Sequence, residues 1–534
     1  MTLRFAPTGR VVAAVLVAMF IMLAGAASAA DSGPIVEVTG GKIRGALLEK
    51  GGAAFKGVPF AAPPVGDLRW RETMPVKPWT GVREATAYGP TCPQILGFAV
   101  PPGTEINEDC LQLDLWTPEW PSKTRKPVMV WIHGGGNFGR FPNPPANDGE
   151  SLSRHGVVLV SINYRVAALG FFSHPKLTEE SPHHASGNQG ILDQIAALKW
   201  VRENIGKFGG DPGNVTIFGE SAGALDVSVL MTSPLSKGLF QRVIAESGPV
   251  TLEGDPLTLA QAEKRGEETA ARWGKPASAS LKDLREVSSA EIMKAEPDYL
   301  RVAPPNLGIA VDGYVFPRPP AEVFASGQEH KVGLIIGSNG REQDPGRPRP
   351  ADLRKTLAQD FGPLAPRAVA LYEQTQPDPI YGTAVEQWST DTSFRCGAVA
   401  QLVWHAAAGN PSFEYAFDRV APGRESVGAT HGAEVWYVFD TLTLGESFGP
   451  PNVKYNATDQ EISEAMQQYW TNFAKTGDPN RGVSANDRTL PAWPKFDAAS
   501  RAYLEFTERG PVAREALRRP FCDLFIENVK RQMK

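Results

Sequence analysis

Residues 215–231, VTIFGESAGALDVSVLM, place a serine between two segments of opposite character. The first four residues are apolar or β-branched and indicate a buried strand, whereas residues 222–231 indicate a helix. Between them lies Gly219-Glu220-Ser221-Ala222-Gly223. A direct turn from strand to helix is cramped, so it needs glycines around the serine, whose oxygen then stands clear of the backbone. The stretch predicts a nucleophilic Ser221; a serine that only caps the helix is the alternative.

Strand-like and helix-like segments alternate through the rest of the chain. Apolar runs at residues 127–132 and 157–163 precede the stretch, and further strands are expected at residues 242–246, 332–336 and 413–417. This alternation of strands and helices is typical of an α/β fold with a mainly parallel central sheet and helices on both faces. Between about residues 250 and 331 the chain is more polar and mostly helical, which predicts an insertion that caps the carboxyl edge of the sheet and walls the site.

The amino-terminal segment has the order of a secretory signal peptide. Arg4 and Arg10 precede an apolar stretch at residues 11–25, and small residues follow it up to Ala30. The apolar stretch is short for a bilayer span, so cleavage near Ala29 or Ala30 is favoured over a signal anchor. We therefore expect an exported protein, secreted or periplasmic, with residues 31–534 as one catalytic domain.

Charge and cysteine content place limits on partners and compartment. Removal of the two arginines leaves 52 Lys and Arg against 59 Asp and Glu, a mild imbalance that indicates neither nucleic acid nor an anionic membrane as a partner. Four cysteines after an export signal predict two disulfides. Cys92 and Cys110 would close a short loop, leaving Cys396 for Cys522, but spacing alone allows three pairings. The sequence gives no indication of the oligomeric state.

A second glycine run predicts donors for a developing negative charge. Gly134-Gly135-Gly136 directly follows the expected strand at residues 127–132. Its amide groups could join the amide of Ala222 around an oxyanion, whereas a plain loop is the alternative for three glycines.

The base must be a histidine that follows the nucleophile and the acid along the chain. Downstream of Ser221 the sequence contains His330, His405 and His431. His431 lies in a loop after an extended stretch, where it could reach the carboxyl edge of the sheet. His330 precedes the strand at residues 332–336 and His405 lies in a helical segment, so structural roles are expected for both.

The acid is expected just past a strand. Glu342 follows the strand at residues 332–336 and is the natural candidate, and Asp344 is its rival. A solvated loop carboxylate is the alternative for either residue.

Longer motifs resemble the type-B carboxylesterase and cholinesterase family of α/β-hydrolases over nearly all of the mature chain. The motifs are Phe55-Lys56-Gly57-Val58-Pro59-Phe60-Ala61, Glu108-Asp109-Cys110-Leu111, Gly187-Asn188-Gln189-Gly190 with Asp193-Gln194, and residues 208–223. The resemblance implies an α/β-hydrolase fold and a triad of Ser221, Glu342 and His431, which prefers Glu342 over Asp344. It also implies oxyanion donors Gly135, Gly136 and Ala222, an electrostatic neighbour Glu220, and disulfides Cys92–Cys110 and Cys396–Cys522.

Three departures from the family pattern bear on the site. Arg341 stands where an aspartate usually precedes the triad glutamate, and Ala224 and Asp226 stand where glycine and serine are common. Asp226 places an acid a little more than one helical turn from Ser221; a buried, hydrogen-bonded carboxylate is its alternative role. Between Cys92 and Cys110 the only aromatic residue is Phe98, where cholinesterases have a tryptophan for the choline cation. A general carboxylesterase is therefore expected.

The leading hypothesis is ester hydrolysis through an acyl-enzyme, with a small-molecule substrate and no metal or organic cofactor. A non-catalytic adhesion protein is a rival, although the intact triad argues against it. His183-His184 is the only feature in favour of metal-dependent hydrolysis. Arg341, Arg347 and Arg349 raise a weaker hypothesis, a substrate with carboxylates such as the side-chain esters of fumonisin toxins; a solvated basic loop is the preferred interpretation.

Overall fold

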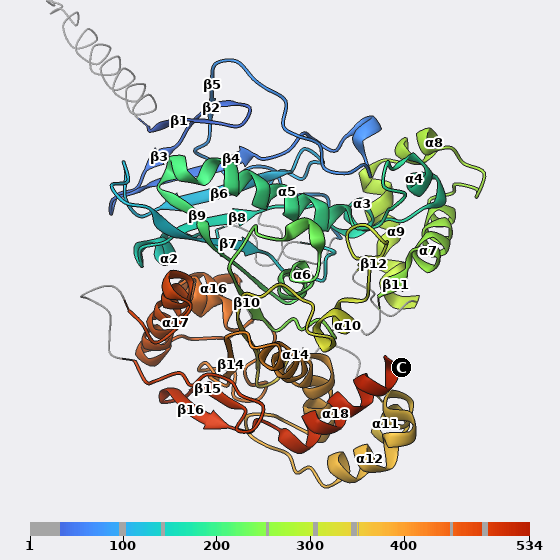
Figure 1. Ribbon diagram of the computed structural model, residues 1–534, viewed down its shortest axis with the longest axis vertical. Coiled ribbons are helices and arrows are strands. Elements are labelled where there is room, and N and C mark those ends of the chain that lie inside the picture. The colour runs from blue at the N-terminus through green and yellow to red at the C-terminus, as the bar shows by residue number, and fades with distance from the viewer. Residues whose placement is uncertain are drawn as a thin grey trace, which may run out of the picture.

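An eleven-stranded sheet runs through the centre of the computed structural model (Figure 1). The structure describes residues 33–95, 103–139, 145–252, 256–302, 308–342, 350, 352–448, 452–482 and 490–533, so the expected signal peptide, Phe98, Asp344, Arg347 and Arg349 lie outside it. In spatial order the strands are β16 (Gly510–Glu515), β15 (Ala502–Thr507), β14 (Ser412–Phe417), β13 (Gly333–Asn339), β10 (Arg242–Glu246), β9 (Gly210–Glu220), β7 (Lys126–Ile132), β8 (Val158–Ile162), β6 (Gln112–Thr117), β4 (Ala53–Pro59) and β3 (Ala46–Leu47).

The central strands are parallel and their carboxyl ends coincide. From β8 to β15 every neighbouring pair is parallel, whereas β16 at one edge and β6, β4 and β3 at the other are antiparallel. Gly219 of β9 is opposite Ile132 of β7, and Glu246 of β10 is opposite both Glu220 of β9 and Gly337 of β13. The segments that follow these four strands therefore emerge at the same edge of the sheet.

The strands expected from the sequence are confirmed in β7, β8, β9, β10, β13 and β14. One boundary was wrong, because β9 begins at Gly210, whereas the expected strand began at Val215. Gly210 pairs with Lys126 of β7, and the register shifts between Lys126 and Val128. This irregularity lets the β9 strand include a proline, since the residues around it are not held in a regular ladder.

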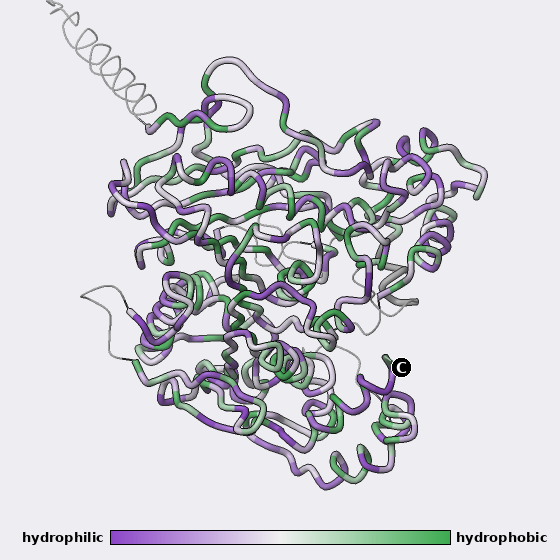
Figure 2. Tube along the Cα trace, viewed as in Figure 1, coloured by the Kyte–Doolittle hydropathy of each residue, from purple (hydrophilic) through white to green (hydrophobic). Residues whose placement is uncertain are grey.

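Helices cover both faces of the sheet. Alternate residues of β7 face opposite sides: Val130 packs in one core with α5 and α6, and Trp131 packs in the other with α17. Figure 2 shows hydrophobic segments concentrated in the central strands and hydrophilic ones on outer helices such as α7. The helices of the described residues are α2 (Glu150–Arg154), α3 (Ala167–Gly170), α4 (Pro175–Glu180), α5 (Gln189–Asn204), α6 (Ala222–Leu230), α7 (Leu259–Arg272), α8 (Leu281–Arg285), α9 (Ser289–Val302), α10 (Pro320–Ala325), α11 (Leu353–Phe361), α12 (Ala365–Glu373), α13 (Ala384–Thr390), α14 (Cys396–Ala407), α15 (Val435–Val438), α16 (Leu442–Phe448), α17 (Ala457–Thr476) and α18 (Arg519–Gln532).

The segment expected as an insertion is mostly helical. It contains α7, α8, α9 and α10 and two short paired strands, β11 (Leu257–Thr258) and β12 (Ala310–Val311). Its helices α7, α8 and α9 share a separate hydrophobic core with α3 and α4, whereas α10 packs in the core of the main sheet. Figure 1 shows α7, α8 and α4 together on one side of the molecule. A role for this segment as a cap over the site, and the boundary of a single catalytic domain, stay predictions.

Smaller features complete the described chain. A three-stranded sheet, β1 (Ile35–Val38), β2 (Gly41–Arg44) and β5 (Val82–Glu84), lies near the amino-terminal end of the described residues. A search of the described helices finds none with both the length and the apolar character of a membrane span.

Two disulfides link distant parts of the chain in the pairing that the family resemblance implies. Cys92 is bonded to Cys110, 18 residues away, in the segment that leads into β6. Cys396, the first residue of α14, is bonded to Cys522 in α18, 126 residues away. Such bonds are typical of secreted proteins, because an oxidising compartment keeps them intact.

We expect loss of the Cys396–Cys522 bond to destabilise the protein more than loss of Cys92–Cys110. Loop-closure entropy amounts to about 5 kcal/mol for a loop of this length and about 3 kcal/mol for the shorter one. The melting temperatures of the Cys396→Ala/Cys522→Ala and Cys92→Ala/Cys110→Ala variants, measured under identical conditions, test this order. A larger drop for the second variant would contradict it.

Candidate active site

Ser221 occupies a strained turn between β9 and α6. Its backbone angles are φ 57° and ψ −121°, a left-handed conformation that non-glycine residues rarely adopt. A Cβ at Gly219 would lie 2.5 Å from the carbonyl oxygen of Ile132, and a Cβ at Gly223 would lie 2.1 Å from the same atom. The two glycines are therefore required, because the turn packs directly against the end of β7.

His431 lies between Ser221 and Glu342. Its Nε2 is 2.7 Å from Ser221 Oγ, and its Nδ1 is 2.7 Å from Glu342 Oε2. The histidine comes from the loop after β14, and Glu342 comes from the loop after β13. The structure thus brings these three residues together, although Ser221 and His431 are 210 positions apart in the sequence.

Glu342 is buried, and the carboxylate oxygen that does not contact His431 is hydrogen-bonded to other groups. Its Oε1 accepts hydrogen bonds from Ser247 Oγ at 2.7 Å and from the backbone amide of Asn339 at 2.6 Å. Sequence reasoning missed Ser247, although its position directly after β10, at the same sheet edge, was a usable signal. These contacts leave Oε2 directed at the imidazole.

The glycine run after β7 approaches the serine closely. A Cβ at Gly134 would lie 2.4 Å from the carbonyl oxygen of Glu220 and 3.1 Å from Ser221 Cβ. Gly135 and Gly136 both have positive φ, 111° and 65°. Ala222 is the first residue of α6, where backbone N–H groups have no acceptor within the helix. The structure therefore places all three expected oxyanion donors in the two segments that meet at Ser221.

Three further glutamates are buried around these residues. Glu220 Oε1 lies 3.3 Å from His431 Nε2, and burial raises the pKa of Glu220 to about 7 even though the imidazole opposes that shift. Burial also raises the pKa of Glu246 to about 8; its Oε1 accepts a hydrogen bond from the Trp470 indole at 2.8 Å. The pKa of Glu434 is raised well above its usual range by burial and by neighbouring carboxylates.

Phe394 was also missed by sequence reasoning. Its ring centroid lies 4.8 Å from that of His431, in a π-helical turn at Asp391–Arg395 that precedes α14. Nothing in the local pattern around Phe394 distinguishes it from a core aromatic residue, since the contact depends on how this turn packs against the His431 loop.

The other histidines that follow Ser221 lie elsewhere. His405 is fully buried in α14 and binds Glu329 through Nδ1 at 2.8 Å. The His330 backbone amide donates to the Met231 carbonyl at the amino end of β13, and burial lowers the pKa of its imidazole. Both positions agree with the structural roles expected for them.

Arg341 binds protein backbone. Its guanidinium donates to the carbonyl oxygens of Ile380 at 3.0 Å, Pro379 at 2.8 Å and Ser426 at 3.1 Å. The side chain is 8% exposed, so it connects two loops instead of facing a substrate. For Arg341 both the substrate-facing loop and the solvated basic loop are wrong, because the residue is buried and these carbonyls occupy its donors.

Asp226 is a buried, hydrogen-bonded carboxylate, which is the alternative role expected for it. Its Oδ1 accepts from Asn137 Nδ2 at 3.1 Å and its Oδ2 accepts from Gln194 Nε2 at 2.5 Å. Burial raises the pKa of Asp226 to about 7, although these hydrogen bonds oppose the shift.

No group of three or more His, Cys, Asp or Glu side chains within the described ranges is arranged to hold a metal ion. His183 stacks on Tyr314, with ring centroids 3.8 Å apart, and its Nε2 lies 3.6 Å from Glu72. This contact gives His183 a packing role at the surface.

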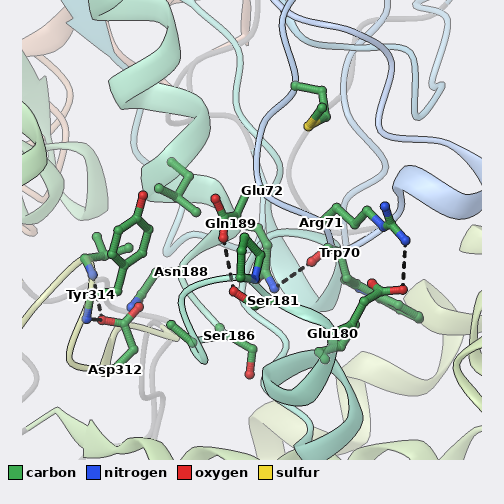
Figure 3. A pocket seen from close by; sticks show the side chains of 17 residues that line it. Trp70, Arg71, Glu72, Glu180, Ser181, Ser186, Asn188, Gln189, Asp312 and Tyr314 are labelled. Carbon is green, nitrogen blue, oxygen red and sulfur yellow. Dashed lines mark hydrogen bonds and ion pairs between the residues drawn. The ribbon is translucent and has the colours of Figure 1, made fainter.

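A pocket of about 210 Å³ lies apart from Ser221 and His431, neither of which lines it. Figure 3 shows Trp70, Glu72, Gln189 and Tyr314 around this pocket. Its charged groups have partners within the protein, since Asp312 accepts from three backbone amides and Glu180 pairs with Arg71 and Arg285. The pocket is therefore separate from the candidate active site.

Comparisons with known proteins agree on one family. The family model described as the carboxylesterase family matches residues 32–361 and 367–525. The chain is similar to a Fumonisin B1 esterase of Sphingopyxis macrogoltabida, with 36% identity over 83% of this chain and 81% of that protein. It is also similar to a medium-chain fatty acyl-CoA hydrolase precursor of Anas platyrhynchos, with 35% identity over 88% of each chain.

Solved structures agree as well. A PNB esterase superposes with a TM-score of 0.77 at 32% identity, over 92% of this chain and 100% of that one. The carboxylesterase of Geobacillus stearothermophilus gives a TM-score of 0.78 at 31% identity, over 92% and 99%. These matches confirm the expected fold and the enzyme class of carboxylic ester hydrolases. The chain therefore belongs to the carboxylesterase family of α/β-hydrolases.

Proposed function

We propose that this protein is a serine carboxylesterase whose nucleophile is Ser221, whose base is His431 and whose acid is Glu342. The observation that carries the proposal is the continuous chain from Ser221 Oγ to His431 Nε2 and from His431 Nδ1 to Glu342 Oε2, with both distances at 2.7 Å. A nucleophile in contact with a base that is oriented by a third group is the arrangement of acyl-transfer enzymes.

The reaction follows from the positions of these atoms. Ser221 Oγ attacks the ester carbonyl while His431 Nε2 takes the hydroxyl proton, and the same proton then goes to the leaving alcohol. Water, activated by His431, hydrolyses the acyl-Ser221 intermediate and releases the acid. Glu342 holds the Nδ1–H tautomer and stabilises the imidazolium. No metal or organic cofactor takes part in these steps.

The negative charge on the carbonyl oxygen is assigned to Gly135, Gly136 and Ala222. Preorganised backbone N–H groups stabilise such an oxyanion because they need no reorientation during the reaction. Support comes from the close approach of the Gly134 backbone to Ser221 Cβ and from the place of Ala222 at the amino end of α6.

Glu220 is assigned as an electrostatic partner of the imidazolium. Its Oε1 lies 3.3 Å from His431 Nε2, and its buried carboxyl has a pKa of about 7. An ionised Glu220 would stabilise the positive charge that His431 carries in both tetrahedral states, since buried charges are only weakly screened.

Export completes the proposal. We assign residues 1–30 as a signal peptide that is removed near Ala29 or Ala30, which sends the enzyme to the periplasm or the medium. The two disulfides support this location.

A second candidate substrate class is an ester of a polycarboxylic acid. The similarity to a Fumonisin B1 esterase favours this class. Arg341 gives no support, because it is bound to backbone carbonyls. Arg347 and Arg349 are the arginines that remain for this role. Neutral esters are the leading substrate class.

Replacement of Ser221 by alanine tests the nucleophile. We expect kcat for a p-nitrophenyl butyrate substrate to fall about 10⁴-fold or more, because the acyl-enzyme cannot form. Covalent labelling by a fluorophosphonate, read by intact mass, should disappear in the same variant. Turnover retained in pure Ser221→Ala protein with an unchanged melting temperature would refute the proposal.

Glu220→Gln tests the electrostatic role through its pH dependence. Glu220 is neutral below about pH 7 and ionised above it, so only the alkaline wild-type enzyme has the extra charge beside His431. We expect the ratio of wild-type to variant kcat/KM to rise from near 1 at pH 5.5 to about 10 at pH 8.5. Glu414→Gln is the control, since burial raises the pKa of Glu414 to about 8 and the charged groups that oppose this shift are Arg501 and Arg395. Equal pH profiles for both variants would refute the assignment.

A matched pair of esters separates the two substrate classes. One p-nitrophenyl ester has an acyl chain that ends in a methyl group, and its counterpart ends in a carboxylate. We expect a higher kcat/KM for the neutral ester at low ionic strength. The Arg341→Gln variant should show the same preference, because the guanidinium of Arg341 binds backbone carbonyls. A preference for the anion that increases as salt falls would favour the polycarboxylate class instead.

A further inference from the structure

Asp226 belongs to a buried polar cluster beneath the glycine loop that follows β7. Asp226, Asn137, Gln194 and Tyr164 are each at most 1% exposed. They come from four separate segments: α6, the loop after β7, α5 and the loop after β8. Polar groups buried at this depth are retained only where their hydrogen bonds are satisfied, so the cluster constrains all four segments together.

Hydrogen bonds connect Asp226 to the glycine loop through Asn137. The amide of Asn137 donates to Asp226 Oδ1 at 3.1 Å, while its own Oδ1 accepts from the Tyr164 hydroxyl at 2.9 Å. Gln194 donates to the second carboxylate oxygen of Asp226 at 2.5 Å. The Tyr164 hydroxyl is also 2.8 Å from the carbonyl oxygen of His133, the residue before the glycines. The side chain of Asn137 is thus held from both sides.

The backbone of Asn137 has a conformation that needs such support. Its φ is +56°, and it directly follows Gly135 at +111° and Gly136 at +65°. Glycine adopts positive φ freely, but a residue with a side chain rarely does. The Asn137 carbonyl accepts a hydrogen bond from the amide of Ala167 at 2.6 Å. This bond anchors the peptide unit between Asn137 and Phe138.

The direction of the glycine amides depends on this anchored residue. The amide of Phe138 donates to the Gly135 carbonyl at 3.0 Å, so Gly135, Gly136 and Asn137 form one tight turn. Rotation at Asn137 would move the Phe138 amide away from the Gly135 carbonyl, and this carbonyl belongs to the peptide unit that carries the Gly136 N–H. A loop of successive glycines has little intrinsic preference for one conformation, and the only side chain within the turn is that of Asn137.

We propose that Asp226 is a positioning residue, which fixes Asn137 and through it the direction of the Gly135 and Gly136 N–H groups toward the oxyanion. The inference rests on the proposed function, in which these two glycines are donors. Asp226 lies five residues after Ser221 on α6, so one helix carries both the nucleophile's turn and the group that aligns the donors. The carboxylate does not touch the substrate in this role.

Asp226→Asn tests the proposal with a side chain of the same shape. Asparagine has an NH2 group in place of one of the two acceptor oxygens, so the donors of Asn137 and Gln194, which face separate oxygens, cannot both keep their bonds in their present orientation. We expect kcat for p-nitrophenyl butyrate to fall about 10- to 100-fold with KM within about 3-fold of wild type, since misplaced oxyanion donors weaken only the transition state. The inhibition constant of a trifluoromethyl ketone, which forms a hemiketal oxyanion on the serine, should rise by a similar factor.

Asn137→Gly tests the route through Asn137. Glycine tolerates the positive φ but lacks the amide, so this variant should fold even if Asp226→Asn does not. We expect a similar loss of kcat, and no further loss in the double variant, because the two side chains act as one unit. Unchanged kcat in Asn137→Gly, or losses that multiply in the double variant, would overturn the proposal.

Asp459→Asn separates positioning from stability. Asp459 is a fully buried carboxylate on α17 that binds Arg419 and Tyr437. It should lower the melting temperature and leave kcat within about 2-fold of wild type. If Asp226→Asn behaves in the same way, Asp226 has only a structural role. Absence of Ser221-dependent hydrolysis in the wild-type protein would instead refute the proposed function itself.

Discussion

The close contact between the end of β7 and the turn at Ser221 is the constraint on which the site depends. Gly219 and Gly223 both approach the carbonyl oxygen of Ile132 so closely that no side chain fits at either position. This contact forces Ser221 into a left-handed conformation, and it brings the Gly134 backbone against the serine. Ser221 and the glycine loop are therefore positioned by one interaction, and the strain at Ser221 is balanced by the buried strands on either side.

The register of the parallel strands brings the other residues of the site to the same edge of the sheet as Ser221. Because β7, β9, β10 and β13 end at the same level, the segments after them carry the glycine loop, Ser221, Ser247 and Glu342 to one edge. His431 reaches that edge from the loop after β14. Ser221, Ser247 and Glu342 lie within three residues of their strand ends, so little conformational freedom has to be lost to place them, whereas His431 lies 14 residues beyond β14.

Buried carboxylates give the site an unusual electrostatic character. Glu220, Glu246 and Glu434 lie near the Glu342–His431 pair, and burial raises the pKa of each. Ionisation of one acid therefore opposes ionisation of the next. Ionisation is favoured at Glu220 by His431, at Glu246 by the Trp470 indole and at Glu434 by the Asn339 amide. Glu220 thus faces the charge of His431 directly, whereas Asp226 is hydrogen-bonded to the neutral amides of Asn137 and Gln194.

The sequence by itself determined six strands of the sheet and the serine turn, because alternating buried strands and a glycine-bracketed serine are local patterns with few structural solutions. It left Glu342 and Asp344 as rivals for the acid, and the family resemblance chose Glu342. It also indicated the two disulfides, once the family resemblance chose among three pairings. Tertiary structure alone decided that Arg341 binds the carbonyls of Ile380, Pro379 and Ser426, that Ser247 holds Glu342, and that Asp226 meets Asn137. These contacts join residues 38 to 95 positions apart, and their partners are set by how loops pack after the sheet has formed, which no local pattern encodes.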